Sequence, residues 1–188
     1  MAKVLPCGCP VRPSSWVMRW RGLIAPEGEV LDLACGEGRH TAMLLLEGRR
    51  VLACDINTAG VEDLRGEPRL SVEARDLEGD PWPWRANRFA GIIVTNYLHR
   101  DHFPHYWESL APEGVFIMET YTRANGFIWG HPRSPAHFLE EGELIRLMPS
   151  GARLVAYEEG QTPEGWCVAR ICFVKPGAGT PLAYGLAP

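Results

Sequence analysis

Lysine, long apolar runs and closely spaced cysteines are all scarce in this chain, and each scarcity excludes a class of protein. Lys3 and Lys175 are the only lysines, and the formal net charge of the 188 residues is -4. Without a basic patch, binding to nucleic acid through phosphate contacts is not expected. No apolar run reaches the length of a membrane-spanning helix, and the N-terminus lacks the apolar core of a secretory signal. We therefore expect a cytoplasmic protein without a membrane partner.

The cysteines predict neither a disulfide framework nor a metal site. The only close pair, Cys7 and Cys9, lacks two further ligands at the spacing that zinc requires. In the predicted compartment, reduced thiols that pack as small apolar side chains are the default. The other four lie within or beside predicted strands, namely Cys35, Cys54, Cys167 and Cys172.

Length and composition indicate one domain with a substantial core. Hydrophobic residues make up 46% of the chain and charged residues 22%, which is typical of globular proteins. We expect an irregular segment over residues 1–13, one folded domain over 14–175, and a tail rich in glycine and proline over 176–188.

One stretch, residues 30–40, organises the rest of the chain. It predicts an apolar strand, a glycine turn and the start of a helix, and it reads Val-Leu-Asp-Leu-Ala-Cys-Gly-Glu-Gly-Arg-His. Glycine lets the backbone approach a ligand closely, and the open N–H groups of a helix start face the bound molecule. The next predicted strand ends in Asp55, where a carboxylate can accept hydrogen bonds from two ribose hydroxyls. Together the two units predict a nucleoside site.

Two families share this layout, and the residues separate them. A dinucleotide fingerprint requires a third glycine and reserves the helix start for a pyrophosphate. Here Thr41 stands in place of that glycine, and Asp32 and Glu37 add negative charge that suits a cation. The stretch resembles the first motif of class I S-adenosylmethionine-dependent methyltransferases, whose ligand carries a sulfonium and an ammonium and no phosphate.

The resemblance implies an α/β fold. Its expected form is a single Rossmann-like, seven-stranded, mostly parallel sheet with an antiparallel C-terminal edge strand and helices on both faces. A third crossover without a helix and a long loop over residues 122–137 are also expected, because both stretches are rich in breakers of regular structure. Strands are predicted from residue 30 and over 50–55, 70–74, 89–95, 114–118, 153–157 and 166–174. Helices are predicted over residues 15–24, 41–47, 58–64, 103–110 and 141–148.

The resemblance also implies where S-adenosylmethionine binds. Asp76 and Leu77 follow the third predicted strand, at the place where the family holds adenine. Ligands of parallel sheets bind beyond the carboxyl ends of the strands, so residues 96–100 should face the transferred methyl group. The residues expected at the cofactor are Asp32, Ala34, Cys35, Gly36, Gly38, Arg39, Asp55, Ile56, Asp76, Leu77, Asn96 and Tyr97.

The predicted function is methyl transfer from S-adenosylmethionine to a small-molecule acceptor. A soft sulfur, selenium or tellurium nucleophile needs no base, whereas an amine or hydroxyl does. The candidate bases are His99, Tyr97 and Tyr121, with His40 and His102 also near the predicted strand ends. Two alternatives stay open: a non-catalytic module that binds S-adenosylmethionine, and an NAD(P)-dependent oxidoreductase on a related sheet.

A narrower resemblance extends from residue 30 to residue 174. The chain is similar to bacterial methyltransferases grouped with the tellurite-resistance methyltransferases, although Tyr121 stands where phenylalanine is frequent. The similar stretches are residues 119–121, 125–127, 130–133, 138–139 and 142–144.

Overall fold

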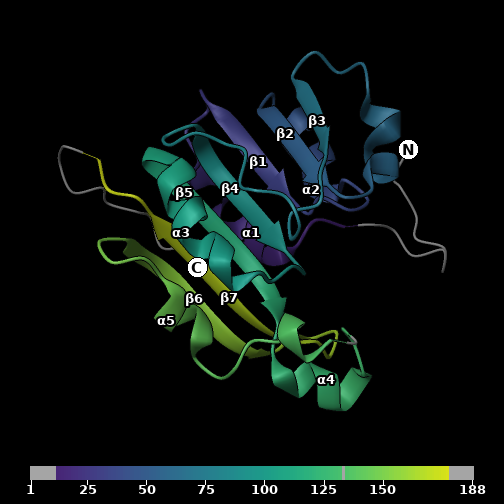
Figure 1. Cartoon of the computed structure of the whole chain (residues 1–188), viewed down its shortest axis with the longest axis vertical. Coiled ribbons are helices and arrows are strands. Elements are labelled where there is room, and N and C mark those ends of the chain that lie inside the picture. Colours follow the sequence, from purple (N-terminus) through teal and green to yellow (C-terminus); the bar gives the residue numbers. More distant parts are fainter. Residues whose placement is uncertain (1–11, 133, 178–188) are drawn as a thin grey trace.

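A sheet of seven strands forms the middle layer of the computed structural model, which describes residues 12–132 and 134–177 (Figure 1). The strand order is β3-β2-β1-β4-β5-β7-β6. Strand β7 runs opposite to the other six strands, and it lies one place in from the edge, which β6 forms. The expected mostly parallel sheet with an antiparallel C-terminal strand is confirmed. The strands are β1 (Glu29–Leu33), β2 (Arg50–Asp55), β3 (Leu70–Ala74), β4 (Phe89–Thr95), β5 (Leu110–Tyr121), β6 (Arg153–Gln161) and β7 (Cys167–Val174).

Helices cover both faces of the sheet, because each central strand is apolar on both sides. Val30 and Ile93 pack with the helices α1 and α2 on one face. Leu31 and Ile92 pack with α3 and α5 on the other face. The helices and 3-10 turns are α1 (Ser15–Trp20), η1 (Arg21–Leu23), α2 (Arg39–Leu46), η2 (Thr58–Leu64), η3 (Arg100–His102), α3 (Phe103–Ser109), α4 (Arg123–Trp129), η4 (Pro135–His137) and α5 (Glu143–Leu147).

The first helix covers the sheet. Ser14 caps its N-terminus, since the Ser14 side chain accepts a hydrogen bond from the Trp16 N–H. Trp16 and Trp20 are buried, and the Trp16 indole donates to the backbone carbonyl of Ile171 in β7. Arg19 on the outer side forms an ion pair with Glu158, with 2.8 Å between the charged atoms. The tryptophans of α1 therefore serve the core.

Two sequence expectations about local structure are wrong. The stretch 122–137 is not a plain loop but contains α4 and η4. Side-chain hydrogen bonds account for this order, because the buried Asn125 donates to the His131 carbonyl and accepts from the Cys167 N–H. Leu110 does not end a helix but begins β5, where it is fully buried and pairs with Phe89. The predicted helix over residues 58–64 has the right bounds and is a 3-10 helix.

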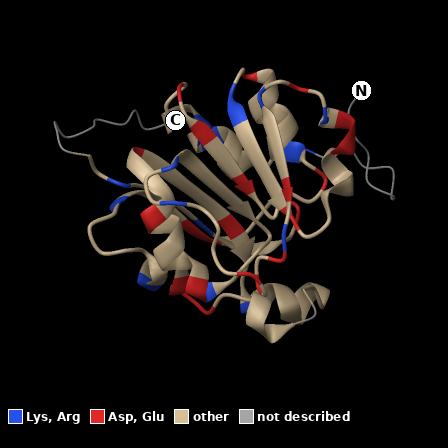
Figure 2. Cartoon of the chain, turned by 45° about the horizontal axis from the view of Figure 1, so that its top comes forward, with Lys and Arg blue, Asp and Glu red and all other residues tan. Residues whose placement is uncertain are grey.

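The carboxyl ends of the parallel strands meet at one edge of the sheet and position the candidate site. The turn between β1 and α2, residues 34–38, is called the cradle turn below. Asp32 pairs in register with Ala53, so Asp32 and Asp55 lie on the same face of the sheet. Figure 2 shows acidic segments at the arrowheads of neighbouring strands.

Some expectations fall on residues that the structure does not describe. The pair Cys7 and Cys9 lies outside the described residues, and so do most of segment 1–13 and tail 176–188. The domain boundaries therefore stay predictions. Within residues 12–132 and 134–177, no helix is long and apolar enough to cross a membrane. The same residues contain no group of three or more histidines, cysteines or acids that could hold a metal ion.

Gly60 in η2 packs closely against the backbone of the cradle turn. A Cβ on Gly60 would lie 2.2 Å from the Gly36 carbonyl oxygen and 2.6 Å from the Glu37 Cα, and backbone atoms cannot yield easily. We expect Gly60→Ala to lower the free energy of unfolding by about 1–3 kcal/mol in urea titrations. Gly22→Ala, with no heavy atom within 4 Å, is the control and should change it by less than about 0.5 kcal/mol. Equal stability of the two variants would contradict this packing.

Candidate functional site

The cradle turn has two glycines in different surroundings: one is tightly packed, and the other borders open space. Gly38 has φ 70° and a Cβ there would lie 2.5 Å from a methyl group of Val61. Gly36 has φ 50°, and a Cβ there would meet nothing within 4 Å. Ala34 also has a positive φ, of 53°, which is uncommon for a residue with a side chain. Gly38 thus fixes the turn against η2, whereas Gly36 borders open space.

Asp55 joins the ends of the first two strands. One of its carboxylate oxygens accepts a hydrogen bond of 2.8 Å from the Gly36 N–H, and the other accepts one of 3.0 Å from the Asn57 N–H. Each carboxylate oxygen has two lone pairs. The group therefore fixes the cradle turn and can still accept two hydrogen bonds from hydroxyl groups of a ligand.

A cavity of about 360 Å³ opens beside Asp55. The loop after β3 supplies much of its wall, together with the residues that follow β1, β2 and β4. Of the predicted cofactor residues, six line this cavity, and Arg75 and Glu78 were not predicted. The sequence indicates Arg75 and Glu78 only through their position, because they flank Asp76 and Leu77. The lining residues are Ala34, Asp55, Ile56, Arg75, Asp76, Leu77, Glu78 and Tyr97.

Asp32 does not line the cavity but lies beneath the cradle turn with its side chain buried. The Thr41 hydroxyl donates to its carboxylate at 2.6 Å. Burial raises the pKa of Asp32 to about 6, although the hydrogen bonds from Thr41 and the charge of Arg39 oppose this shift. Asp32 therefore holds the start of α2 in place rather than contacting a ligand in the cavity.

His40 is a structural residue in a neutral state. Its Nε2 accepts a hydrogen bond of 3.0 Å from the Ser14 N–H, so the ring proton is on Nδ1, 4.0 Å from the Asp32 carboxylate. Burial, followed by the charge of Arg39, lowers the pKa of His40 to about 3. It is fully buried, which makes it unsuitable as the base considered from the sequence.

Arg39 begins α2 and points to the end of β4. Its guanidinium donates to the Thr95 hydroxyl at 3.4 Å. In the described part of the chain, no carboxylate lies within ion-pair distance of it. Asn96, the next residue after β4, has φ 58° and is exposed. The edge between β1 and β4 therefore offers a cation beside the cradle turn.

The predicted bases do not form one cluster. Tyr97 and His99 gather around His102, with ring centroids 6.2 Å and 4.2 Å from it. The Tyr97 hydroxyl and the Nδ1 atoms of both histidines are buried and have no hydrogen-bond partner among the described residues. Tyr121 instead contacts His131 and Trp166.

The environments of these groups decide which can accept a proton. Burial raises the pKa of Tyr97 far above its ordinary value, and burial also raises the pKa of Tyr121. Both phenols stay protonated at neutral pH. Burial, followed by the neighbouring histidines, lowers the pKa of His102 to about 4. His99 is the remaining candidate base.

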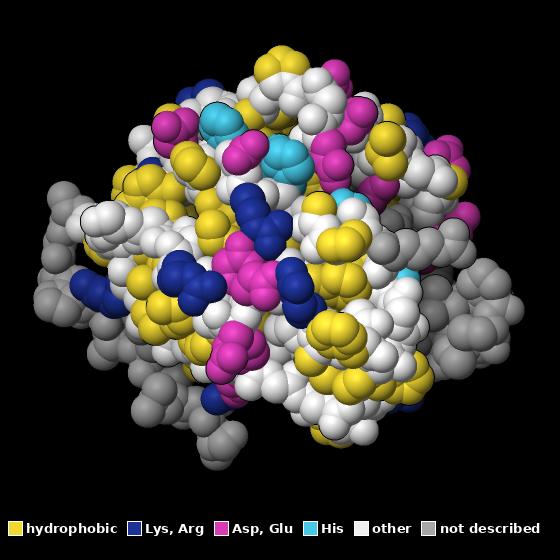
Figure 3. Space-filling model, turned by 60° about the horizontal axis from the view of Figure 1, so that its bottom comes forward, with side chains coloured by type: hydrophobic (Ala, Val, Ile, Leu, Met, Phe, Trp, Pro, Cys, Tyr) yellow, Lys and Arg dark blue, Asp and Glu magenta, His cyan; other side chains and the backbone are white. Residues whose placement is uncertain are grey.

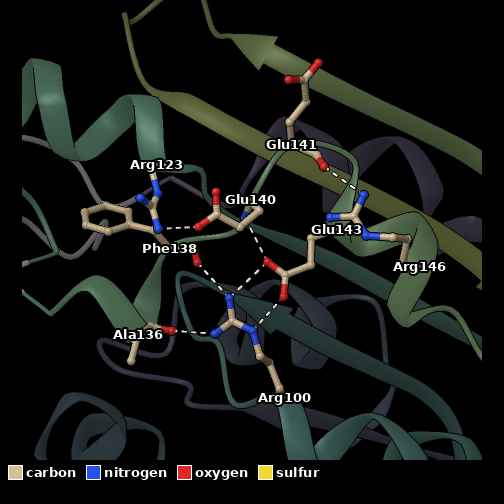
Figure 4. Close-up of polar contacts among 8 residues, drawn as sticks. All are labelled: Arg100, Arg123, Ala136, Phe138, Glu140, Glu141, Glu143 and Arg146. Carbon is tan, nitrogen blue, oxygen red and sulfur yellow. Dashed lines mark hydrogen bonds and ion pairs between the residues drawn. The ribbon is translucent and has the colours of Figure 1, made fainter.

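Arg100 fastens the segment between β5 and α5 to the end of β4 (Figure 4). Its guanidinium binds both carboxylate oxygens of Glu143, at 2.6 and 2.9 Å, and donates to the carbonyls of Ala136 and Phe138. Glu143 also accepts from the Glu140 N–H at 2.7 Å. A bidentate pair with this many partners is geometrically specific. The β5–α5 segment, residues 122–142, is thus anchored next to His99.

Comparisons with known proteins agree with this architecture. Residues 30–114 match a family model described as a methyltransferase domain. A geranyl diphosphate C-methyltransferase from Streptomyces coelicolor A3(2), solved with Mg²⁺, geranyl diphosphate and S-adenosyl-L-homocysteine, is 13% identical. Its TM-score is 0.66, over 85% of this chain and 75% of that one. A 1,6-didemethyltoxoflavin-N1-methyltransferase from Burkholderia thailandensis, with that compound and S-adenosylhomocysteine bound, is 22% identical. Its TM-score is 0.60, over 86% and 76% of the two chains.

A third neighbour shows what the fold alone leaves undecided. SpnF, a 4+2 cyclase, is 13% identical with a TM-score of 0.63, over 85% of this chain and 78% of that one. At such identities the likeness establishes the fold, and one fold supports several chemistries. No curated protein matches the chain significantly.

The buried Asp32 predicts a stability that depends on pH. Since its folded pKa is raised to about 6 from an ordinary value near 3.8, ionisation costs stability above pH 6, and the cost disappears below pH 4. We expect Asp32→Asn to stabilise the protein by up to about 3 kcal/mol at pH 8 and to match the wild type at pH 4. Urea unfolding between pH 4 and pH 8 measures the free energy of unfolding, with Glu67→Gln, a change at an exposed acid, as the control. A variant that is less stable at pH 8 would contradict it.

Proposed function

We propose that this chain is a class I S-adenosylmethionine-dependent methyltransferase, that it methylates a small molecule, and that the cavity beside Asp55 binds the adenosyl part of the donor. The observation that supports this most directly is the pair formed by Asp55 and the open Gly36. When bound, S-adenosylmethionine supplies the methyl group on its sulfonium sulfur, and it leaves as the neutral thioether S-adenosylhomocysteine.

The residues at the cavity fit such a ligand. Asp55 keeps free lone pairs for the two ribose hydroxyls, and Ile56 and Leu77 offer apolar surface for a flat base. Tyr97 also lines the cavity, and its ring can pack against a flat base. The acidic lining favours a cationic donor and disfavours a pyrophosphate.

We assign the remaining predicted cofactor residues by their positions. Arg39 suits the methionine carboxylate, because it is cationic, half-buried and without an ion pair among the described residues. Cys35 and Gly38 shape the cradle turn through backbone contacts, and Asn96 borders the methyl group at the end of β4. Asp32 acts from beneath, as a positioning residue that holds α2.

The proposed acceptor is a soft nucleophile, a thiol or a related selenium or tellurium compound. Such an atom attacks as its anion and needs no protein base. Tyr97 and Tyr121 stay protonated, so neither phenol serves as a base at neutral pH. The resemblance to tellurite-resistance methyltransferases in the β5–α5 segment points the same way. Alignment of the acceptor opposite the sulfonium is then the main contribution of the protein.

Binding of the donor is tested by isothermal titration with S-adenosylmethionine. We expect Asp55→Ala to weaken binding at least tenfold, because the ribose loses its acceptors and the Gly36 N–H loses its anchor. Glu67→Gln, at an exposed acid that does not line the cavity, should bind like the wild type. Wild-type protein that does not bind, or undiminished binding by Asp55→Ala, would remove the assignment. Binding without turnover of thiols, amines or acids would instead indicate a non-catalytic module.

The need for a base is tested by pH profiles with thiols of different acidity. If the acceptor ionises without help, kcat/KM rises with an inflection that follows the pKa of each thiol. His99→Asn should then keep the profile and lose less than about threefold in rate. An inflection that stays at one pH for every thiol and disappears in His99→Asn would show that His99 is a general base.

A further inference from the structure

Helix α4 presents three consecutive apolar side chains to solvent. The exposed fractions are 83% for Phe127, 56% for Ile128 and 49% for Trp129. Figure 3 shows hydrophobic side chains gathered on this end of the molecule, next to a compact group of acidic and basic side chains. Contiguous apolar surface of this kind usually marks a site of binding.

This surface is held rigidly. The side chain of Asn125 is bonded to two backbone groups, and a Cβ on Gly126 would collide with the Phe138 ring at 2.6 Å. The Trp129 indole N–H donates to the Gly165 carbonyl at 2.9 Å. These contacts fix the orientation of α4, so its apolar residues are exposed because of the way the helix is held and not because the region is loosely packed.

Three aromatic rings extend this surface toward the cradle turn, and we call them the aromatic wall. The rings of Trp129 and Trp166 lie 5.0 Å apart at 41°, and those of Trp166 and Tyr121 lie 6.0 Å apart at 61°. Trp166 is 37% exposed. The wall therefore combines residues of α4, the β6–β7 hairpin and the end of β5.

Tyr121 connects the aromatic wall to the strand ends beside the proposed donor site. Tyr121 ends β5, and the neighbouring strand β4 ends at Thr95, whose hydroxyl receives the Arg39 guanidinium. Arg39 is close enough to act electrostatically on the Tyr121 hydroxyl. Tyr121 thus contacts Trp166 and is also near Arg39, the first residue of α2.

We propose that the aromatic wall is the acceptor subsite and that it takes a planar, uncharged aromatic body carrying the nucleophile, an aromatic thiol. The inference rests on the proposed function and names its substrate class. Stacked and edge-on ring contacts favour a flat ligand. The wall itself consists of ring faces, the Trp129 N–H is already bonded, and the nearby Glu119 is paired with Arg170 at 2.6 Å.

The chemistry balances without a further reactant. The thiol loses its proton to water, and the thiolate sulfur forms a bond to the methyl carbon as the bond from that carbon to the sulfonium breaks. The products are an aryl methyl thioether and S-adenosylhomocysteine. The wall supplies position and exclusion of water, and no residue in it changes its redox or protonation state.

The test compares 2-naphthalenethiol with 2-mercaptoethanol as acceptors of the wild-type chain. We expect a KM at least tenfold lower for the aromatic thiol. Trp166→Ala should raise that KM five- to tenfold, which corresponds to one lost aromatic contact, and should leave kcat and the Kd of S-adenosylmethionine unchanged. Trp166→Phe should restore most of the affinity. Leu46→Ala removes another exposed apolar side chain, 90% exposed at the far end of α2, and should change nothing.

A second readout does not depend on turnover. Isothermal titration with the product, 2-(methylthio)naphthalene, should show binding to the wild type that weakens five- to tenfold in Trp166→Ala. Equal KM values for the two thiols, or product binding that Trp166→Ala does not change, would overturn the aromatic wall as a subsite while S-adenosylmethionine still binds. Sedimentation that shows a dimer dissociated by Phe127→Ser would overturn it too, since the surface would then face a second copy. Loss of S-adenosylmethionine binding by the wild type would contradict the proposed function itself.

Discussion

The buried carboxylate of Asp32 is the interaction on which the rest of the site depends. It joins β1 to the start of α2 through the Thr41 hydroxyl, and the neutral ring of His40 continues the link to the start of α1. Burial makes an ionised carboxylate expensive, as its raised pKa shows. If stability alone determined the residue at position 32, an apolar side chain would stand in place of the aspartate. The position instead fixes where the cradle turn leaves the sheet, and thereby where the N–H of Gly36 points.

The interaction of Asp32 with Thr41 also positions the cradle turn and the cavity beside Asp55. The cradle turn is fixed against η2 by Gly38 and against β2 by Asp55, so one carboxylate both orders the turn and remains able to accept from a ligand. The acids around the cavity explain why a pyrophosphate is disfavoured. In a dinucleotide site the third glycine permits close helix packing, whereas here Thr41 occupies that position and uses its hydroxyl to hold Asp32.

The sequence predicted this half of the fold well, because its signals are local. The bounds of β2, β3 and β4 are those that the sequence predicted. The cavity brought together six predicted residues, and it added Arg75 and Glu78, which carry no pattern of their own. The β5–α5 segment could not be predicted in the same way. Its helix depends on Asn125 bonding to Cys167, a contact between residues 42 positions apart that no local pattern contains.

The two halves differ in what fixes them, and this difference bears on function. Strand register and backbone turns hold the cradle turn and the cavity beside Asp55. Side chains such as Arg100 and Asn125 hold the β5–α5 segment. Backbone-determined geometry tolerates sequence change, which fits the shared fold at identities of 13% to 22%. Side-chain anchors can be exchanged to present another surface. A cyclase among the neighbours has the same fold. Under the proposed function, the specificity for the acceptor is therefore to be sought in the β5–α5 segment and the hairpin beside it, and not in the cradle turn.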